Sequence, residues 1–105
     1  MVKPSKPNLQ ISPGVLHKLA GKKPPVKQHE ILECFANREG KFLFDTREDH
    51  QSDPPTRWFI AETNFGRKLK IAFIAKGAAV IIRTAYDPNH EETRIYNKYG
   101  HQQSK

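Results

Sequence analysis

A chain of 105 residues, 36% of them apolar, has room for one small domain and not for a second hydrophobic core. It contains no run of about 18 apolar residues, and its opening MVKPSKPNLQISP lacks the apolar stretch of a secretory signal, so neither a membrane span nor secretion is expected. The one cysteine, Cys34, excludes an internal disulfide. A cytoplasmic protein is the expectation that fits these features.

The net charge of +7 is unevenly distributed along the chain. Residues 1–29 contain six lysines and no acid, residues 30–56 have a net charge of −4, and residues 57–105 have a net charge of +5. A chain this basic attracts polyanions, so RNA, DNA or an acidic protein is the expected partner. The alternative for the lysine-rich N-terminal part is a tail that only aids solubility.

The N-terminal part predicts a tail, a short strand and a helix. Residues 1–7 contain two prolines and two lysines and are expected to be flexible. Polar and apolar residues alternate over 8–11, as in a strand. Ser12 followed by Pro13 is typical of a helix start, and Gly21 would end that helix. Its apolar stripe consists of Val15, Leu16, Leu19 and Ala20.

A second helix is predicted over residues 26–36, with Cys34 as a small core residue. Its buried face would consist of Ile31, Leu32, Phe35 and Ala36. A residue within 37–40 is expected to end this helix in the left-handed conformation. A strand follows over 41–45, and the polar, acidic stretch 46–56 is expected to be a surface loop, either a plain connector or a substrate gate.

Residues 57–85 form the centre of the predicted fold. They contain three apolar runs rich in Ile, Phe and Val, separated by short breaks at 64–66 and 76–77. Glycine in each break allows the positive φ of a tight turn, so the three runs predict an antiparallel β-meander. The residues expected to be buried in it are Trp58, Ile71, Phe73 and Ile82.

The last predicted element is a helix over 90–99. Asn89 and Glu92 have the spacing of a capping box. Acidic residues in the first turn are stabilised by the positive end of the helix dipole. Gly100 would end the helix. The chain has no repeats and no second apolar region, which leaves a single unit.

Together these elements predict the α+β class. The N-terminal helices would pack on a mostly antiparallel β-meander sheet, and a C-terminal helix would close the structure. Residues 1–105 would form one domain, with flexible tails at 1–7 and 101–105.

The motifs of most enzyme classes are missing from this sequence. The five histidines are scattered, none at the spacing of a zinc site, so no metal is expected. There is no glycine-rich phosphate loop, nucleotide fingerprint or serine-centred elbow, so no cofactor is expected either. Apolar helix neighbours argue against Cys34 as a nucleophile.

A basic and aromatic set remains, and it suits RNA. It consists of Arg57, Trp58, Arg67, Lys70, Arg83, Tyr86, His90, Arg94, Tyr96 and Tyr99. Guanidinium groups bind phosphate and aromatic rings stack on unpaired bases. Such groups can also cleave RNA without a metal, because attack by a 2′-hydroxyl needs a base, cations and an acid. The structural alternative is that the tyrosines anchor helices and the arginines are merely solvated.

Two basic residues are expected to mark the site on the sheet. Lys70 and Arg83 would lie close together on paired strands, on the less covered face. Arg57 would reach the same face from the third strand, and Tyr86 follows where the last strand ends. The alternative is a solvated pair of basic residues with no ligand.

Three stretches carry a resemblance to known proteins: ECFANREGKFLFDTRE, PPTRWFIAETNFGRKLKIAFI and RTAYDPNHEETRIYNKYG. They resemble small bacterial proteins labelled ADP-ribosyl-(dinitrogen reductase) hydrolase. That label implies a far longer, all-helical, metal-dependent enzyme, and this chain lacks the acidic clusters that would hold the metal. The layout from Ile11 to Tyr99 instead resembles BrnT toxins, which belong to the RelE-like ribonuclease superfamily and are made in operons with a DNA-binding antitoxin.

The resemblance implies a RelE-like fold and the toxin of a type II toxin–antitoxin pair, a metal-independent endoribonuclease. With the basic set, it implies catalytic roles for Arg83, Tyr86, His90 and Arg94, and RNA binding by Arg57, Arg67, Lys70 and Tyr96. The implied partners are RNA, free or on the ribosome, and a cognate antitoxin, without cofactor, metal or membrane. The alternative is a non-catalytic RNA- or protein-binding module on the same fold.

Overall fold

Three long antiparallel strands form the middle of the structure, as the sequence predicts. The computed structural model describes residues 8–46 and 54–100. In chain order its elements are β1 (Asn8–Gln10), α1 (Pro13–Ala20), α2 (Gln28–Asn37), β2 (Leu43–Phe44), β3 (Thr56–Glu62), β4 (Lys68–Lys76), β5 (Ala79–Tyr86) and α3 (His90–Tyr99). The predicted α+β class is therefore confirmed.

The five strands form one mixed sheet in the order β1-β5-β4-β3-β2. The pairs β2–β3, β3–β4 and β4–β5 are antiparallel, whereas the short β1 lies parallel to β5. The turns of the meander are made as expected, because Gly66 and Gly77 have φ of 86° and 60°. A sheet that is mostly antiparallel is thus confirmed, with a parallel strand at one edge.

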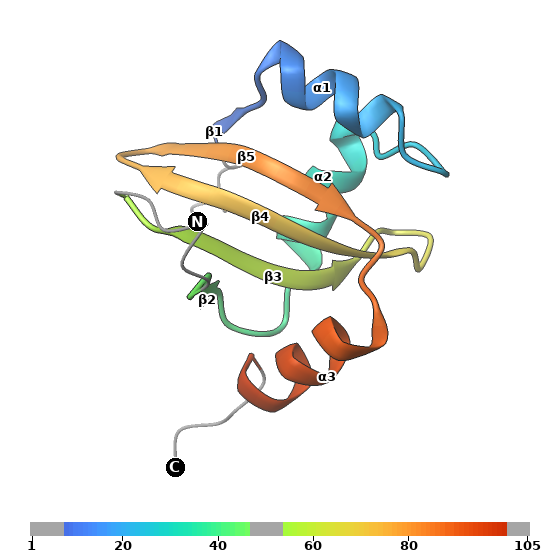
Figure 1. Ribbon diagram of the computed structural model, residues 1–105, viewed down its shortest axis with the longest axis vertical. Helices are drawn as coiled ribbons and strands as arrows, with labels where there is room; N and C mark the ends of the chain where they lie inside the picture. The colour runs from blue at the N-terminus through green and yellow to red at the C-terminus, as the bar shows by residue number, and fades with distance from the viewer. Residues whose placement is uncertain (1–7, 47–53, 101–105) are drawn as a thin grey trace, which may run out of the picture.

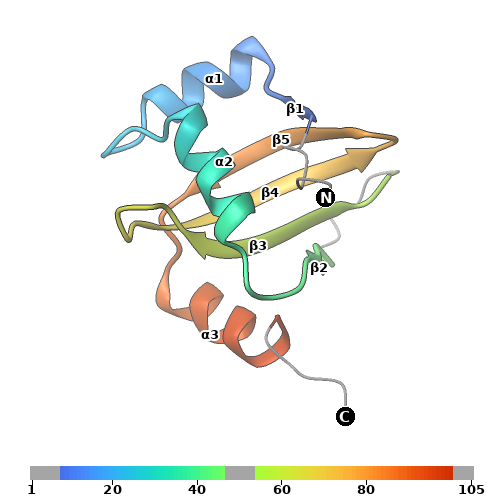
Figure 2. The ribbon, with the colours of Figure 1, turned by 180° about the vertical axis from the view of Figure 1, so that it is seen from behind.

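Helices lie on both sides of this sheet (Figures 1 and 2). The helix α2 crosses the face that Figure 2 presents, and α1 lies along the β5 side. The helix α3 lies below β3 in both views, where it contacts that strand. Because side chains alternate along a strand, each central strand presents one set of residues to α2 and another toward α3.

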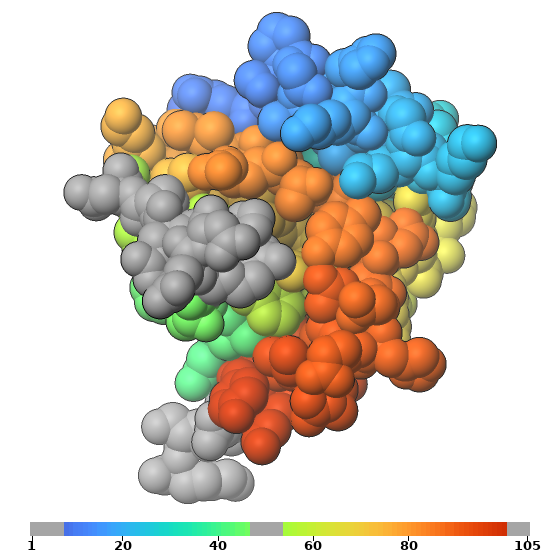
Figure 3. Space-filling model, viewed as in Figure 1, coloured from blue at the N-terminus to red at the C-terminus, as the bar shows by residue number. Residues whose placement is uncertain are grey.

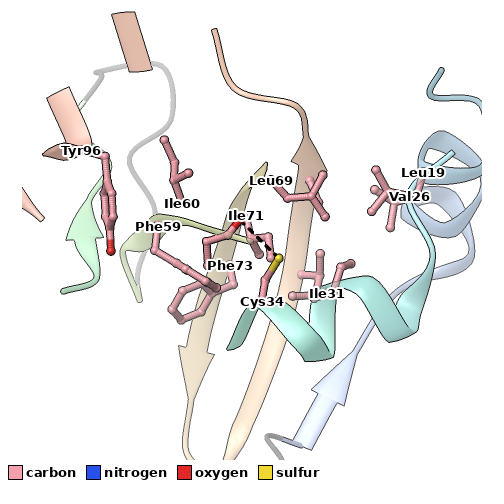
Figure 4. Packing of buried hydrophobic residues seen from close by; sticks show 13 residues of the cluster. Leu19, Val26, Ile31, Cys34, Phe59, Ile60, Leu69, Ile71, Phe73 and Tyr96 are labelled. Atoms are coloured by element: carbon pink, nitrogen blue, oxygen red, sulfur yellow. Dashed lines mark hydrogen bonds between the residues drawn. The ribbon is translucent and has the colours of Figure 1, made fainter. Parts of the chain in front are cut away.

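The main core lies between α2 and the sheet (Figure 4). Phe59, Ile71 and Phe73 are buried there, and Phe35 from α2 packs edge-on against Phe59 and Phe73 with ring centroids 4.7 and 5.4 Å apart. Of the four residues predicted to be buried, Ile71, Phe73 and Ile82 are at most 2% exposed, and Trp58 is only partly buried.

Cys34 is part of this core, as predicted. Its side chain is fully buried, and its Sγ lies 3.6 Å from the carbonyl oxygen of Ala61 (Figure 4). Burial, with the nearby carboxylates of Glu30 and Glu33, raises the pKa of the Cys34 thiol to about 12. The thiol is protonated at neutral pH and its role is packing.

The helix starts follow the sequence signals closely. The Ser12 hydroxyl accepts the amide of Val15 at 3.3 Å, and Pro13 occupies the first turn of α1. At α3 the Asn89 side chain accepts the amide of Glu92 at 2.8 Å. In return the Glu92 carboxylate accepts the amide of Asn89 at 3.0 Å, which completes the predicted capping box.

The end of α2 differs from the prediction. No residue from 37 to 40 is left-handed, and the capping residue Arg38 is extended, with φ −61° and ψ 130°. The helix begins at Gln28, because Lys27 is extended and the Glu30 carboxylate accepts its amide at 2.9 Å. Val26 lies in the connector before the helix but is buried there, so this apolar residue extends the apolar pattern of α2 in the sequence.

The apolar stripes of the two helices are narrower than predicted. In α1, Leu19 is buried, whereas Leu16 is 44% exposed and Ala20 is exposed. In α2, Ala36 is also exposed. For α1, the exposure of Leu16 and Ala20 follows from its position beside β5, where the sheet covers only part of the helix.

Only Leu43 and Phe44 form a strand in the predicted segment 41–45. The chain turns away before them because the Lys41 amide bonds to the Gly100 carbonyl at 2.8 Å, and the Lys41 carbonyl accepts the Tyr96 hydroxyl at 2.7 Å. This strand is therefore shortened by contacts with α3.

Some predictions lie outside the described residues. These are the two tails, 1–7 and 101–105, and most of the predicted loop, residues 47–53. Within the part of the chain that the structure describes, none of the helices has the length and apolar character needed to cross a bilayer.

The core assignment makes a stability prediction with a matched control. Phe73→Ala removes a ring that is 2% exposed and should lower the free energy of unfolding by about 3–5 kcal/mol. Phe65→Ala removes a ring that is 93% exposed and should change it by less than about 0.5 kcal/mol. Urea denaturation followed by circular dichroism measures both, and equal losses would contradict the core described here.

Candidate functional site

A charged cluster lies on the α3 side of the sheet. The Nζ of Lys70, on β4, lies 2.9 Å from Oε2 of Glu92, in the first turn of α3. The hydroxyl of Tyr86, at the end of β5, donates to the same oxygen at 2.6 Å. A cation, a phenol and a carboxylate from three elements thus meet at one atom.

Register and capping bring these groups together. Lys70 on β4 is paired with Tyr86 on β5, so their side chains lie on the same face of the sheet. The capping box fixes Glu92 by its other oxygen, Oε1, which accepts the Asn89 amide. With Oε1 held at the helix end, Oε2 is directed at the strand residues.

The Lys70 ammonium is held deep in the structure. The residue is 7% exposed, and its Nζ lies 4.6 Å from the centroid of the Trp58 ring and 5.6 Å from that of Tyr86. A buried ammonium is costly unless it is paired, and here a carboxylate and two aromatic faces provide the compensation. The positive charge of Lys70 is therefore largely balanced by the groups around it.

Glu92 is ionised at neutral pH. Burial by itself would raise the pKa of its carboxyl group, but the hydrogen bonds from Tyr86, the Asn89 amide and Lys70 outweigh burial and lower the pKa. The carboxylate is therefore an acceptor, with the Tyr86 hydroxyl as one donor to it.

Two members of the cluster, Lys70 and Glu92, form part of the wall of a pocket of about 560 Å³, and Tyr86 lies behind them, outside the lining. The pocket is lined by Leu43, Phe44, Asp45, Thr46, Trp58, Lys70, Glu92, Ile95 and Tyr99. Phe44 and Tyr99 are large and half-exposed, at 55% and 49%. Aromatic walls with a few convergent polar groups are typical of a ligand site, and this volume is large enough for a nucleotide.

The space-filling view shows how α3 and β5 join near this cluster (Figure 3). The orange atoms at the end of β5 continue into the orange-red atoms of α3 as one surface below the blue α1. Lys22, from the connector after α1, places its Nζ 5.4 Å from the centroid of the Tyr86 ring. The approach to Tyr86 is therefore basic.

Of the predicted site residues, the structure joins Lys70 and Tyr86, but Arg83 is placed differently. A β-bulge interrupts the β4–β5 pairing between Ala72 and Phe73. Ala72 pairs with Thr84 and Phe73 with Ile82, so Arg83 has no partner in the register and is exposed. The expected neighbour of Lys70 on β5 is replaced by Tyr86, three residues further along.

Arg57 does not share the face of Lys70. It is paired with Phe73, a residue of the α2-side core, whereas Lys70 is paired with Ile60. The Arg57 guanidinium lies 5.1 Å from the centroid of the Phe44 ring at the sheet edge. The expectation that it reaches the face of Lys70 is wrong, because of the alternation of the strand.

Arg67 has its guanidinium engaged within the protein. It donates to the carbonyls of Pro24 and Pro25 at 2.8 and 2.7 Å, and it pairs with Asp87 at 2.7 Å and with Glu30 at 3.2 Å. It thereby joins the proline connector, α2 and the segment between β5 and α3. These contacts support a structural role for Arg67.

Tyr96 is also placed inside the protein. It is 1% exposed, its hydroxyl donates to the Lys41 carbonyl, and its ring lies 5.7 Å from that of Trp58. Burial is the main cause that raises the pKa of its hydroxyl. A ring in this position supports the pocket wall from behind and is not open for stacking on a base.

His90 and Arg94 lie on the exposed part of α3. Both are exposed, and Arg94 forms an ion pair with Glu91 at 2.6 Å. His90 is the first residue of α3 and lies two positions before Glu92. Their predicted catalytic roles remain predictions.

Sequence reasoning missed two contributors to this site, Glu92 and Phe44, and it included Tyr99 only as a member of the basic and aromatic set. The sequence predicts a capping role for Glu92, and a carboxylate has a second oxygen that is free to accept from another group. A signal was present in Lys70, a lysine between apolar residues of a central strand, because such a buried cation requires an acid. Phe44 and Tyr99 become neighbours of Trp58 only through the tertiary fold.

Metal binding and relatives give no further assignment. Within residues 8–46 and 54–100, no three His, Cys, Asp or Glu side chains are grouped so that they could hold a metal ion. Comparison of the chain with protein-family models, with curated proteins and with solved structures finds no match. The interpretation of the site therefore depends on its own geometry.

The lowered pKa of Glu92 predicts a pH-dependent contribution to stability. A carboxyl group of lowered pKa stabilises the fold above its ordinary value of 4.5 and loses that contribution as the pH falls through the lowered value. Glu92→Gln should therefore cost about 2 kcal/mol near pH 7 and much less near pH 3. Glu91→Gln, at an exposed pair, is the control and should have a smaller effect. A cost for Glu92→Gln that is equal at both pH values would contradict the cluster.

Arg67 can be tested against its exposed neighbour. Arg67→Ala removes contacts to three segments and should lower the free energy of unfolding by about 2–3 kcal/mol. Arg67→Lys should restore little, because an ammonium cannot reproduce the planar fork. Lys68→Ala, at an exposed position, should cost under about 0.5 kcal/mol. A folded, fully stable Arg67→Ala variant that loses RNA binding would return this residue to the RNA-binding set.

Proposed function

We propose that this chain is a cytoplasmic, metal-independent endoribonuclease, the toxin of a type II toxin–antitoxin pair of RelE-like type. The observation that carries the proposal is the contact of Lys70, Tyr86 and Glu92 at one carboxylate oxygen beside an aromatic pocket. RNA is the substrate, and a cognate antitoxin is the partner that restrains the activity. The net charge of +7 supports a polyanionic substrate.

The three groups match the needs of RNA cleavage. The Glu92 carboxylate takes the proton from the 2′-hydroxyl as that oxygen forms a bond to phosphorus. The Lys70 ammonium stabilises the charge that develops on the phosphate. The bond from phosphorus to the 5′-oxygen breaks, and the Tyr86 hydroxyl gives its proton to the leaving oxygen, which yields a 2′,3′-cyclic phosphate.

The hydrogen bond between Tyr86 and Glu92 allows the cycle to close. After cleavage the phenolate of Tyr86 regains the proton now held by the Glu92 carboxyl group, along the 2.6 Å contact. Trp58, Phe44 and Tyr99 hold a base of the substrate by stacking, since every base has a π-face. Arg83, His90 and Arg94 complete the predicted catalytic set on β5 and α3.

A second candidate is favoured by the same cluster. The charge of Lys70 is already balanced by Glu92, and the Lys70 side chain is buried, as expected for a structural pair. A protein with this arrangement would bind RNA or a protein through its basic surface and the pocket, without cleavage. The candidates differ in one observable, the appearance of a cyclic phosphate end.

Cleavage should depend on a single oxygen atom. Tyr86→Phe removes the hydroxyl, keeps the ring beside Lys70, and should reduce cleavage of a single-stranded RNA by about 10²-fold or more. Tyr99→Phe keeps a stacking ring in the pocket and should leave cleavage nearly unchanged. Product ends analysed by electrophoresis measure both, with translating ribosomes as a second substrate.

Three outcomes separate the possibilities. Cleavage by Tyr86→Phe at the parent rate would contradict the proposed centre, and a loss in Arg83→Ala instead would move the centre to Arg83. Binding of RNA that weakens steeply between about 50 and 200 mM salt, without cleavage, would favour the binding module. No binding at low salt would contradict both candidates.

A further inference from the structure

One edge of the sheet is only partly covered by a strand. The strand β3 extends from Thr56 to Glu62, but β2 pairs only with Arg57 and Trp58. The last four residues of β3, 59–62, therefore have β4 on one side and, among residues 8–46 and 54–100, no strand on the other. An edge of this kind can pair with a strand of another chain.

The direction of the backbone groups follows from the flanking bonds. The Asp45 amide bonds to the Thr56 carbonyl at 2.8 Å on the β2 side, and the Thr63 amide bonds to the Arg67 carbonyl at 2.9 Å on the β4 side. In an antiparallel strand these directions alternate, so Ile60 and Glu62 direct their amide and carbonyl groups away from β4.

Most of these outward groups have no partner in the part of the chain that the structure describes. The Glu62 carbonyl accepts the Asn37 side-chain amide at 2.9 Å. The other three outward groups are the amide and the carbonyl of Ile60 and the amide of Glu62. None of the three forms a hydrogen bond with a described residue. Two backbone donors, the amides of Ile60 and Glu62, and one acceptor, the Ile60 carbonyl, thus lie along the edge. An added strand pairs with backbone groups in this arrangement.

The neighbouring chain is held away from this edge by α3. Continuing the β2–β3 register would place Lys41 opposite Ile60, but both backbone groups of Lys41 are bonded elsewhere, to Tyr96 of α3 and to Gly100, which caps that helix. A Cβ on Gly40 would lie 2.5 Å from the Tyr96 hydroxyl, so this close approach requires glycine. The edge is kept open by specific contacts.

The open edge lies in a groove of about 930 Å³. One wall is the end of α2 with the residues after it, 36–39, and the other is α3, through Thr93, Tyr96 and Asn97. The floor is the end of β3 from Ile60 to Glu62, followed by Thr63, and Figure 4 shows Ile60 and Phe59 pointing in opposite directions. The groove is distinct from the pocket, which lies along the other side of α3.

We propose that this groove binds an extended, acidic segment of a partner protein, which adds to β3 as a strand opposite Ile60 and Glu62. The main chain of the segment supplies the missing partners of the edge. The proposal does not depend on ribonuclease activity, because it concerns a different face of α3.

Shape and charge favour this occupant. A second copy of the chain is a poor occupant, because its own β3 edge would also lie in a groove between α2 and α3. The helices of the two copies would collide before the two β3 edges could pair. The groove itself is balanced, with Arg38 and Lys68 against Glu39 and Glu62. Selection of an acidic segment then comes from the net charge of +7, which attracts acidic partners at long range.

A single backbone amide can test the proposal. Glu62→Pro removes the outward amide of an exposed residue and leaves the bonds to β4, as proline at a sheet edge allows. Glu62→Ala is the matched control, because it removes the same side chain and keeps the amide. Both variants are first shown by circular dichroism and thermal melting to remain folded.

The probe is a phage-displayed library of random seven-residue peptides, selected on the full chain. Enriched peptides should be acidic, and they should bind Glu62→Pro at least about 10-fold more weakly than Glu62→Ala, which should bind as the parent does. Amide signals of Ile60 and Glu62 in NMR spectra should shift on binding.

The remaining outcomes would overturn the proposal. They are the absence of any enriched peptide, equal binding to the two variants, or enriched peptides without excess acid. A dimer of the parent chain that dissociates in Glu62→Pro would assign the edge to a second copy instead. Loss of RNA cleavage in Tyr86→Phe bears only on the pocket, so the two proposals fail separately.

Discussion

The Glu92 carboxylate connects local and tertiary structure in this protein. One oxygen caps α3 by accepting the Asn89 amide, and the other accepts both Lys70 and Tyr86. A lysine in the middle of a sheet is tolerated because this carboxylate is held in place by the helix that it caps. The position of α3 on the sheet, and with it the pocket and the groove on either side, depends on the same few atoms.

The meander and the helix starts were predictable because their causes are local. Gly66 and Gly77 permit turns that other residues resist, and Ser12 and Asn89 supply capping oxygens within the same turn of chain. The short β2 was not predictable, since its length is set by bonds from Lys41 to α3, far away in sequence. The contacts of Arg67 were not predictable either, since they join three segments that are far apart in the sequence.

The candidate site was predicted in part, and one extra residue explains the difference. With an uninterrupted register from the Phe73–Ile82 pair, Lys70 would lie opposite Ala85, and Arg83 would share its face. The β-bulge shifts the pairing by one residue, so Tyr86 takes that place and Arg83 loses it. The basic and aromatic composition therefore indicated the kind of site, whereas the identity of the partners of Lys70 depended on a bulge that the sequence does not reveal.

The helix α3 separates the two candidate surfaces and is held at both ends. Its first turn is held by Glu92, and near its end the Tyr96 ring is enclosed by Gly40 and Gly100, where a Cβ at either glycine would approach Tyr96 to 2.5 Å. Tyr96 also borders the groove and lies against Trp58 of the pocket. One buried ring thus packs against the walls of both surfaces, so the groove and the pocket share Tyr96 as a common support.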